Sequence, residues 1–185
     1  CGLTWEKVDS TILPQFFASI SLWRAMGAGA VAGTLTIAYT GSHARIRYAV
    51  SEFGTISTVG GNGSGAVVQA AHAVGVGTTT LLVNLASFAS ASNATYGMLS
   101  ILANTTSTQG TGFTEIADLA TAAQSIATEW RVDNDQTVDW IWSTAATAGA
   151  IGVELAVLPA GAAGILLERI ERHYPRGDMR GGMRG

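Results

Sequence analysis

Alternation of apolar with polar or small side chains, at a period of two, is the feature that most constrains this fold. It recurs in five short runs, at residues 35–39, 46–50, 81–85, 138–142 and 151–157. Successive side chains of a strand point to opposite faces of a sheet, so such runs are typical of half-buried strands. A helix is indicated only weakly, by the alanine-rich residues 117–128. The pattern predicts an all-β chain of about eight to ten strands, forming a β-sandwich or jelly roll.

An internal repeat adds to this prediction. A Gly-hydrophobe-Thr start, a Trp-Arg pair and a strand that ends in glutamate follow one another in residues 2–55 and again in 112–157. Changes in loop length between the copies would explain why the spacing of equivalent residues is not constant. The repeat predicts two related halves, packed face to face. We therefore expect a β-sandwich domain over residues 1–158 and an extended C-terminal docking tail over 159–185.

The composition is poor in charge. Only 12% of the 185 residues are charged and 48% are hydrophobic, and an ordinary soluble domain has about 25% charged residues. This balance predicts that other subunits bury part of the surface. A net charge of −3 offers no electrostatic footprint for nucleic acid. One cysteine and three scattered histidines exclude an internal disulfide framework and a Cys/His zinc cluster.

The two ends of the chain leave alternatives open. The chain begins at Cys1 without a basic and an apolar signal region. Cys1 is then a lipidation site, or the sequence starts downstream of the true N-terminus, or a partner chain supplies the missing first strands. The most apolar stretch, residues 145–167, is interrupted by Glu154, Pro159 and several glycines. It predicts a strand, a turn and a tail segment, and no membrane span.

Arginine and glutamate occupy equivalent places in the two repeats. We expect Arg24 to pair with Glu52 and Arg131 to pair with Glu154 as structural ion pairs. The functional alternative is a pair of carboxylates for glycoside hydrolysis, Glu52 with Glu154. A salt-bridged carboxylate is a poor general acid, so the structural interpretation is favoured. No catalytic residue is expected, and the chain is not predicted to be an enzyme.

Two further motifs have a structural and a functional interpretation. Trp140 and Trp142 share one face of a predicted strand. They either fill the space between two sheets or, if exposed, form a platform for stacking on sugar rings. Residues 133–135, Asp-Asn-Asp, resemble an oxygen-rich calcium loop but are also typical of a hairpin turn. The glycine-rich loop at 60–65 lacks the Lys-Ser/Thr of a phosphate-binding loop, so no cofactor or metal is expected.

The tail carries three spaced arginines, Arg176, Arg180 and Arg184, between glycines. Such a segment suits docking on an acidic surface of a neighbouring subunit.

Several motifs appear together in a recognisable order: residues 2–5, 22–25, 50–53, 62–69, 93–97, 112–116 and 128–135. In this order they resemble a recurrent β-rich module of bacteriophage and viral-metagenome structural proteins. The resemblance covers residues 2–155. It implies a virion or appendage part, such as a decoration, head-fibre or tail protein, and it implies no catalytic residues.

The sequence therefore predicts a structural assembly protein of a virion or extracellular appendage. Its partners would be copies of itself and other structural proteins of the assembly, with no nucleic acid and no membrane span. The alternative is a carbohydrate-binding β-sandwich module for surface attachment, with Trp140 and Trp142 stacking on a glycan.

Overall fold

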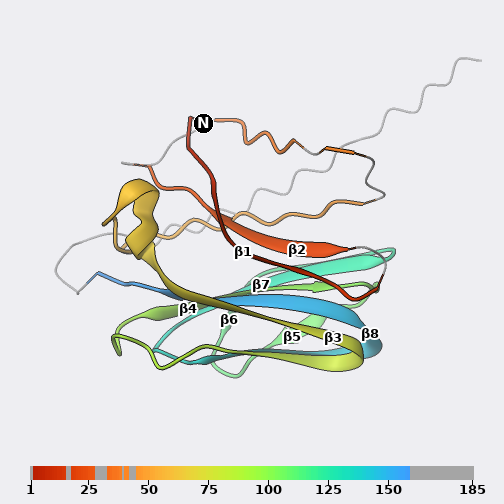
Figure 1. Ribbon diagram of the computed structural model, residues 1–185. Coiled ribbons are helices and arrows are strands. Elements are labelled where there is room, and N and C mark those ends of the chain that lie inside the picture. The colour runs from red at the N-terminus through yellow and green to blue at the C-terminus, as the bar shows by residue number, and fades with distance from the viewer. Residues whose placement is uncertain (1, 16–17, 28–32, 39, 42–44, 159–185) are drawn as a thin grey trace, which may run out of the picture.

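The computed structural model describes residues 2–15, 18–27, 33–38, 40–41 and 45–158 (Figure 1). The described chain contains eight strands and one short 3₁₀ helix. In chain order these are β1 (Glu6–Ile12), β2 (Ser19–Arg24), η1 (Gly61–Ala66), β3 (Val67–Asn84), β4 (Ala94–Ile101), β5 (Ser107–Gln109), β6 (Thr114–Thr121), β7 (Gln124–Val132) and β8 (Thr137–Leu155). The all-β prediction is confirmed.

The strands form two antiparallel sheets. The larger has six strands in the order β3-β8-β4-β7-β6, with β5 paired to the first part of β8. The smaller is the β1–β2 hairpin. The last strand, β8, therefore lies inside the large sheet, between β3 and β4, and β3 and β6 form its edges. The strand pairing gives one large sheet and one hairpin, whereas an ordinary β-sandwich has two sheets of similar size.

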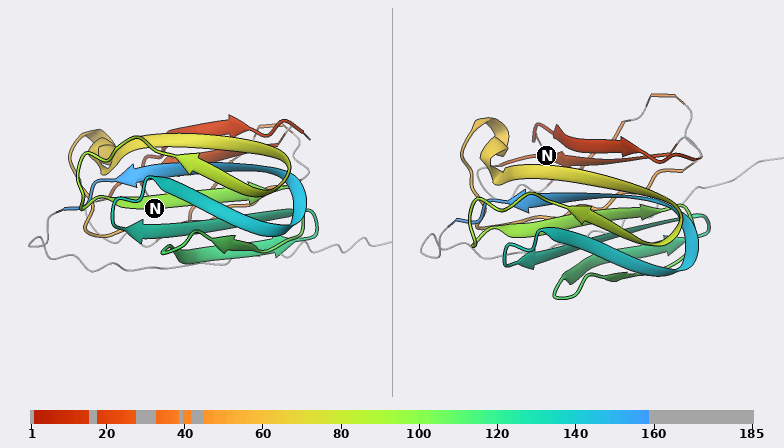
Figure 2. Two further views of the ribbon diagram at one scale, coloured as in Figure 1. Left: turned by 90° about the horizontal axis from the view of Figure 1, so that it is seen from below. Right: turned by 60° about the horizontal axis from the view of Figure 1, so that its bottom comes forward.

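The large sheet folds over its own face. Its strands β3 and β8 have 18 and 19 residues and pair along their whole length, with register shifts near residues 75–80. The first part of β8 returns over the second part: a Cβ built on Gly152 would lie 2.9 Å from Val138 Cγ2 of the same strand. Figure 2 shows the bend of the two strands at one end of the sheet. The irregular pairing and the small residues at the bend allow this change of direction.

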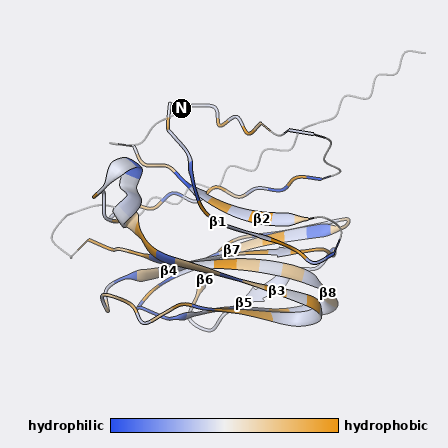
Figure 3. Ribbon diagram, viewed as in Figure 1, coloured by the Kyte–Doolittle hydropathy of each residue, from blue (hydrophilic) through white to orange (hydrophobic). Residues whose placement is uncertain are grey.

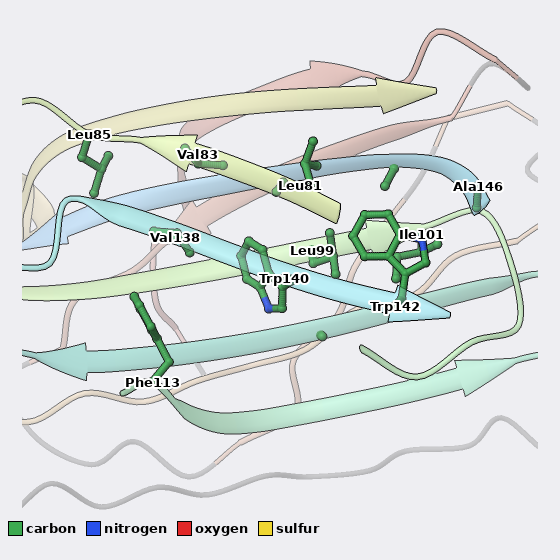
Figure 4. Close-up of a cluster of buried hydrophobic side chains, with 13 residues drawn as sticks. Leu81, Val83, Leu85, Leu99, Ile101, Phe113, Val138, Trp140, Trp142 and Ala146 are labelled. Carbon is green, nitrogen blue, oxygen red and sulfur yellow. The ribbon is translucent and has the colours of Figure 1, made fainter. Parts of the chain in front are cut away.

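Two apolar clusters pack on the two faces of the large sheet. The first lies inside the fold-over (Figure 4) and contains Leu81, Val83, Leu85, Leu99, Ile101, Phe113, Ala127, Val138, Trp140, Trp142, Ala146, Ala148 and Ala150. The second lies between the sheet and the β1–β2 hairpin and contains Leu13, Ile20, Ala94, Tyr96, Ile116, Ile151, Val153 and Leu155. Figure 3 shows apolar bands along the strands that supply these residues. The period-two pattern reflects this division, because alternate residues of β4 and β8 enter opposite clusters.

The β1–β2 and β6–β7 hairpins, which belong to the two predicted repeats, differ in register. Trp23 lies opposite Lys7, five residues after Gly2, whereas Trp130 lies opposite Thr114, two residues after Gly112. Both hairpins have a register shift in their first strand, between Lys7 and Asp9 and between Glu115 and Ala117. The likeness ends with the hairpins, because residues 33–38 and 45–53 contain no strand whereas residues 137–155 are one continuous strand.

Three local predictions are wrong. The described parts of 35–39 and 46–50 are not strands. Residues 117–128, the weak helix candidate, lie within the β6–β7 hairpin.

The predicted tail with its arginines, Arg176, Arg180 and Arg184, lies outside the described residues, as does Cys1.

Candidate functional site at the β3 edge and the β1–β2 hairpin

Trp140 and Trp142 do not form a surface platform. Their exposed fractions are 1% and 6%, and both side chains lie inside the fold-over with Leu99 and Ile101 (Figure 4). They alternate with Asp139 and Ile141 along β8, so they point inward. The sugar-stacking interpretation of these two residues is therefore wrong. The packing interpretation holds, because the two indoles fill the space between the folded layers.

Neither expected ion pair forms. Arg24 binds Glu6 across the β1–β2 hairpin, with 2.5 Å between Nη2 and Oε2, and Glu52 is exposed. Arg131 binds Asp133 and Asp135, the latter with 2.7 Å between Nη1 and Oδ2.

The sheet geometry explains why Arg131 and Glu154 do not form an ion pair. Arg131 and Glu154 both lie opposite Thr95, on the two strands that flank β4. They are thus two strand spacings apart, which is roughly 10 Å. Arg131 instead contacts the turn of its own hairpin, and it also donates to the Thr111 carbonyl at 2.8 Å. Residues 133–135 therefore serve the turn, in which Asn134 has a φ of 43°.

Glu154 is fully buried and holds three chain segments together. Its carboxylate accepts hydrogen bonds from Gln69 Nε2 at 2.6 Å, Asn93 Nδ2 at 2.5 Å and the Ala89 amide at 3.1 Å. These donors come from β3 and from the connection between β3 and β4. Glu154 has no exposed surface, whereas Glu52 is exposed, so the two do not form a pair of carboxylates in a cleft.

Glu129 is a second buried carboxyl, and the sequence analysis did not single it out. Its Oε2 accepts from the Gly110 amide at 3.1 Å, and its Oε1 has no hydrogen-bond partner. Burial, assisted by Asp139, Asp135 and Glu115, raises the pKa of Glu129 to about 8. Burial also raises the pKa of Asp118 and of Asp139. The one signal in the sequence is a glutamate flanked by the inward-facing residues of β7.

These carboxyl groups do not form a metal site. No group of three or more His, Cys, Asp or Glu side chains in the described part of the chain is arranged to hold a metal ion. Within the same residues, no helix is long and apolar enough to cross a membrane.

The edge strand β3 exposes apolar side chains. Val68, Val74 and Val76 are 44%, 40% and 52% exposed, and they alternate with half-buried residues. No described strand pairs with the outer side of β3, because the strand order of the sheet ends there. The β1–β2 hairpin packs nearby, through a hydrogen bond of 2.9 Å between His72 Nδ1 and Asp9 Oδ2. An unpaired backbone edge with an apolar face is therefore accessible beside this hairpin.

The β1–β2 hairpin exposes two tryptophans. Trp23 in β2 is 50% exposed, and Trp5, directly before β1, is 38% exposed. Both lie at the same end of the hairpin, because Trp23 pairs with Lys7. The period-two pattern places Trp140 and Trp142 on one strand face, but it does not show which tryptophans of the chain face the core.

A small apolar hollow of about 170 Å³ lies where residues 53–57 cross the large sheet. Its lining includes Phe53, Ile56, Trp130 and Leu155. Phe53 also contacts Tyr96 edge to face, with ring centroids 5.3 Å apart. These contacts attach the segment before η1 to the sheet.

No family model, curated protein or solved structure matches this chain. The site is therefore interpreted from its own geometry.

Proposed function

We propose that this protein is a structural assembly protein whose copies associate through the β3 edge. The observation that supports the proposal is the length and chemistry of that edge. β3 runs for 18 residues with an unpaired outer side, and it exposes valines along one face. The most specific form of the proposal is a component of a virion or extracellular appendage, such as a capsid decoration, head-fibre or tail protein. That form rests on the resemblance of the sequence motifs.

Edge strands of monomeric proteins are normally protected. Lysine, other charged residues, proline or a bulge on the edge prevents pairing with another chain. β3 contains no Lys, Arg, Asp, Glu or Pro, and His72 is its one ionisable side chain. The register shifts of β3 lie at its start and at the bend, and the stretch between them, residues 69–75, pairs regularly with β8. This uncharged stretch suits pairing of its outer side with another strand. The low overall charge of 12% is consistent with surfaces that subunits bury.

The other edge of the sheet differs in charge. β6 has eight residues and carries Glu115 and Asp118. A β3 edge free of fixed charge is better matched by a second β3 than by this acidic strand. We therefore expect a symmetric contact, in which two β3 strands pair antiparallel about a two-fold axis. The remaining surfaces of the pair stay free for other structural proteins of the assembly.

Analytical ultracentrifugation of the full chain, with electron microscopy of the same sample, tests the proposal. We expect dimers or larger assemblies of the wild type. The double variant Val68→Lys/Val76→Lys places charges on the edge and should sediment as a monomer. Val132→Lys is the matched control, because Val132 is 54% exposed but lies at the end of β7, away from this edge. It should assemble like the wild type.

Two results would overturn the proposal. One is a wild type that stays monomeric at its highest soluble concentration. The other is a double lysine variant that assembles as well as the wild type while the control behaves in the same way. Circular dichroism of each variant verifies that the fold is retained.

A further inference from the structure

We infer that the β1–β2 hairpin carries a binding site for a neutral oligosaccharide, with Trp5 and Trp23 as the stacking surface. The inference is independent of the proposed assembly through β3. It rests on the placement and exposure of the two indoles, on the polar groups around them and on the small apolar area that they offer.

The hairpin register brings the two tryptophans together. Trp23 lies directly opposite Lys7, and Trp5 precedes Lys7 by two residues, before the register shift of β1. Trp5 lies directly before β1, and residues two apart along an extended chain point to the same face, so we place Trp5 diagonal to Trp23 on one face of the hairpin. Diagonal cross-strand neighbours are about 7–8 Å apart, within reach of aromatic side chains.

The β6–β7 hairpin shows that the tryptophan of a Trp-Arg pair in a hairpin strand is not exposed by necessity. Trp130 lies opposite Thr114. It packs against the second apolar cluster and lines the hollow closed by Phe53 and Ile56. Trp23 belongs to neither apolar cluster and is half exposed. The exposed half of Trp23 is therefore open for a ligand to contact.

The size of the patch favours a small ligand over a second protein. With exposed fractions of 38% and 50%, the two indoles offer about 200 Å² of ring surface together. A stable protein interface buries about 800 Å² on each partner. Two neighbouring aromatic faces instead match the flat apolar faces of sugar rings.

The surroundings of the indoles are polar. Lys7 and Ser21 lie on the same face as Trp23, whereas the Glu6–Arg24 ion pair, one residue further along each strand, lies on the opposite face. The Lys7 ammonium donates hydrogen bonds and the Ser21 hydroxyl both donates and accepts them, as sugar hydroxyls require. Among the described residues around the indoles, Lys7 supplies the only net charge. This near-neutral surface favours a neutral sugar.

An open hollow of about 490 Å³ lies at the same end of the hairpin. Asn62 connects it to the hairpin, because its Nδ2 donates to the Thr4 carbonyl at 2.8 Å and its Oδ1 accepts from the Met26 amide at 3.2 Å. The lining combines the polar side chains of Thr58 and Asn62 with the apolar Met26 and three glycines, Gly27, Gly60 and Gly63. This hollow offers room for further sugar units beyond the two indoles.

Titration calorimetry of the full chain with cellohexaose, chitohexaose and maltohexaose tests the inference. We expect at least one of these neutral hexasaccharides to bind with a Kd of about 1 mM or tighter. Trp5→Ala and Trp23→Ala should each weaken binding at least about tenfold, and Trp23→Phe should restore part of it. Ile12→Ala is the matched control, because Ile12 lies on the same hairpin and is 73% exposed. It should bind like the wild type.

The inference is overturned if none of the three sugars binds, or if Trp23→Ala binds as well as the wild type. It is also overturned if the wild type binds no sugar and Trp23→Ala sediments differently from the wild type. In that case a second copy of the chain occupies this face. The double lysine variant of the β3 edge should bind sugar like the wild type. The failure of one proposal is therefore distinguishable from the failure of the other.

Discussion

Gly97 in β4 and Gly152 in β8 lie opposite each other in the sheet, and neither position has room for a methyl group. A Cβ on Gly97 would lie 2.3 Å from Val138 Cγ1 and 2.7 Å from the Trp140 ring. The glycine pair thus sets how closely the first part of β8 approaches the sheet beneath it.

Gly97→Ala should lower the free energy of unfolding by about 1–3 kcal/mol, because buried and rigid side chains must move to admit the methyl group. Urea denaturation measures this change. Gly61→Ala is the control, since a Cβ there meets nothing within 4 Å. Equal stability of the two variants would mean that the fold-over is not tightly packed at this point.

Trp140→Ala should lower the free energy of unfolding by about 3–5 kcal/mol, because it leaves a large cavity inside the fold-over. Trp23→Ala, at a half-exposed site, should change it by less than about 1 kcal/mol. Urea denaturation distinguishes the two, and Trp140→Phe replaces Trp140→Ala if the latter does not fold. Similar losses for both tryptophans would contradict the assignment of one to the core and the other to the surface.

Glu129 should make the protein less stable as the pH rises. Its pKa of about 8 in the folded state lies above that of a glutamate in an unfolded chain, about 4.3. Its protonated form is therefore favoured by folding. This contribution is fully present below about pH 4 and is lost progressively as the pH rises to about 8.

Glu129→Gln removes this titration and retains an acceptor for the Gly110 amide. The variant should be more stable than the wild type at pH 8.5, with a smaller difference at pH 5. Thermal unfolding at several pH values measures the effect, and Glu52→Gln at an exposed carboxylate serves as the control. A wild type and variant with parallel pH profiles would show that Glu129 does not titrate in this range.

Glu154→Leu should lower the free energy of unfolding by about 2–4 kcal/mol. It would leave the donors of Gln69, Asn93 and Ala89 buried without an acceptor, and each such group is costly. A triple variant with Gln69→Leu and Asn93→Leu added should recover part of the loss, because it removes two of these donors. No recovery would show that the carboxylate contributes little through these hydrogen bonds.

The alternating pattern predicted strands correctly where other strands lie beside the segment and pair with its backbone. In β4 and β8, inward and outward residues alternate because both faces of the sheet are covered by different layers. The same pattern failed at residues 35–39 and 46–50. There Ile37, Tyr48 and Val50 remain 41–44% exposed. None of these three residues lies in a strand. Periodicity describes the side chains, whereas a strand also needs a neighbour for its backbone.

The site could be anticipated only in part. The repeat predicted ion pairs, Arg24 with Glu52 and Arg131 with Glu154, that do not form, and the sheet order keeps Arg131 apart from Glu154. Arg131 binds Asp133 and Asp135 in the turn that follows its own strand, and these carboxylates lie nearer to it than Glu154 does. The choice between buried and exposed tryptophans depended on the fold-over, which brings residues 138–142 beneath β4. No local pattern in the sequence indicates that the ribbon of β3 and β8 bends.

The central position of β8 has a consequence for the order in which this protein acquires its structure. Partners in β3 and β8 are separated by 53 to 88 residues along the chain. During synthesis from the N-terminus, β3 and β4 are made long before the strand that lies between them. Both have unsatisfied backbone groups until β8 arrives, so the large sheet closes late and slowly. The nascent chain therefore carries β3 and β4 without their shared partner until residue 155 has been made, and during that time each can pair with a strand of another chain.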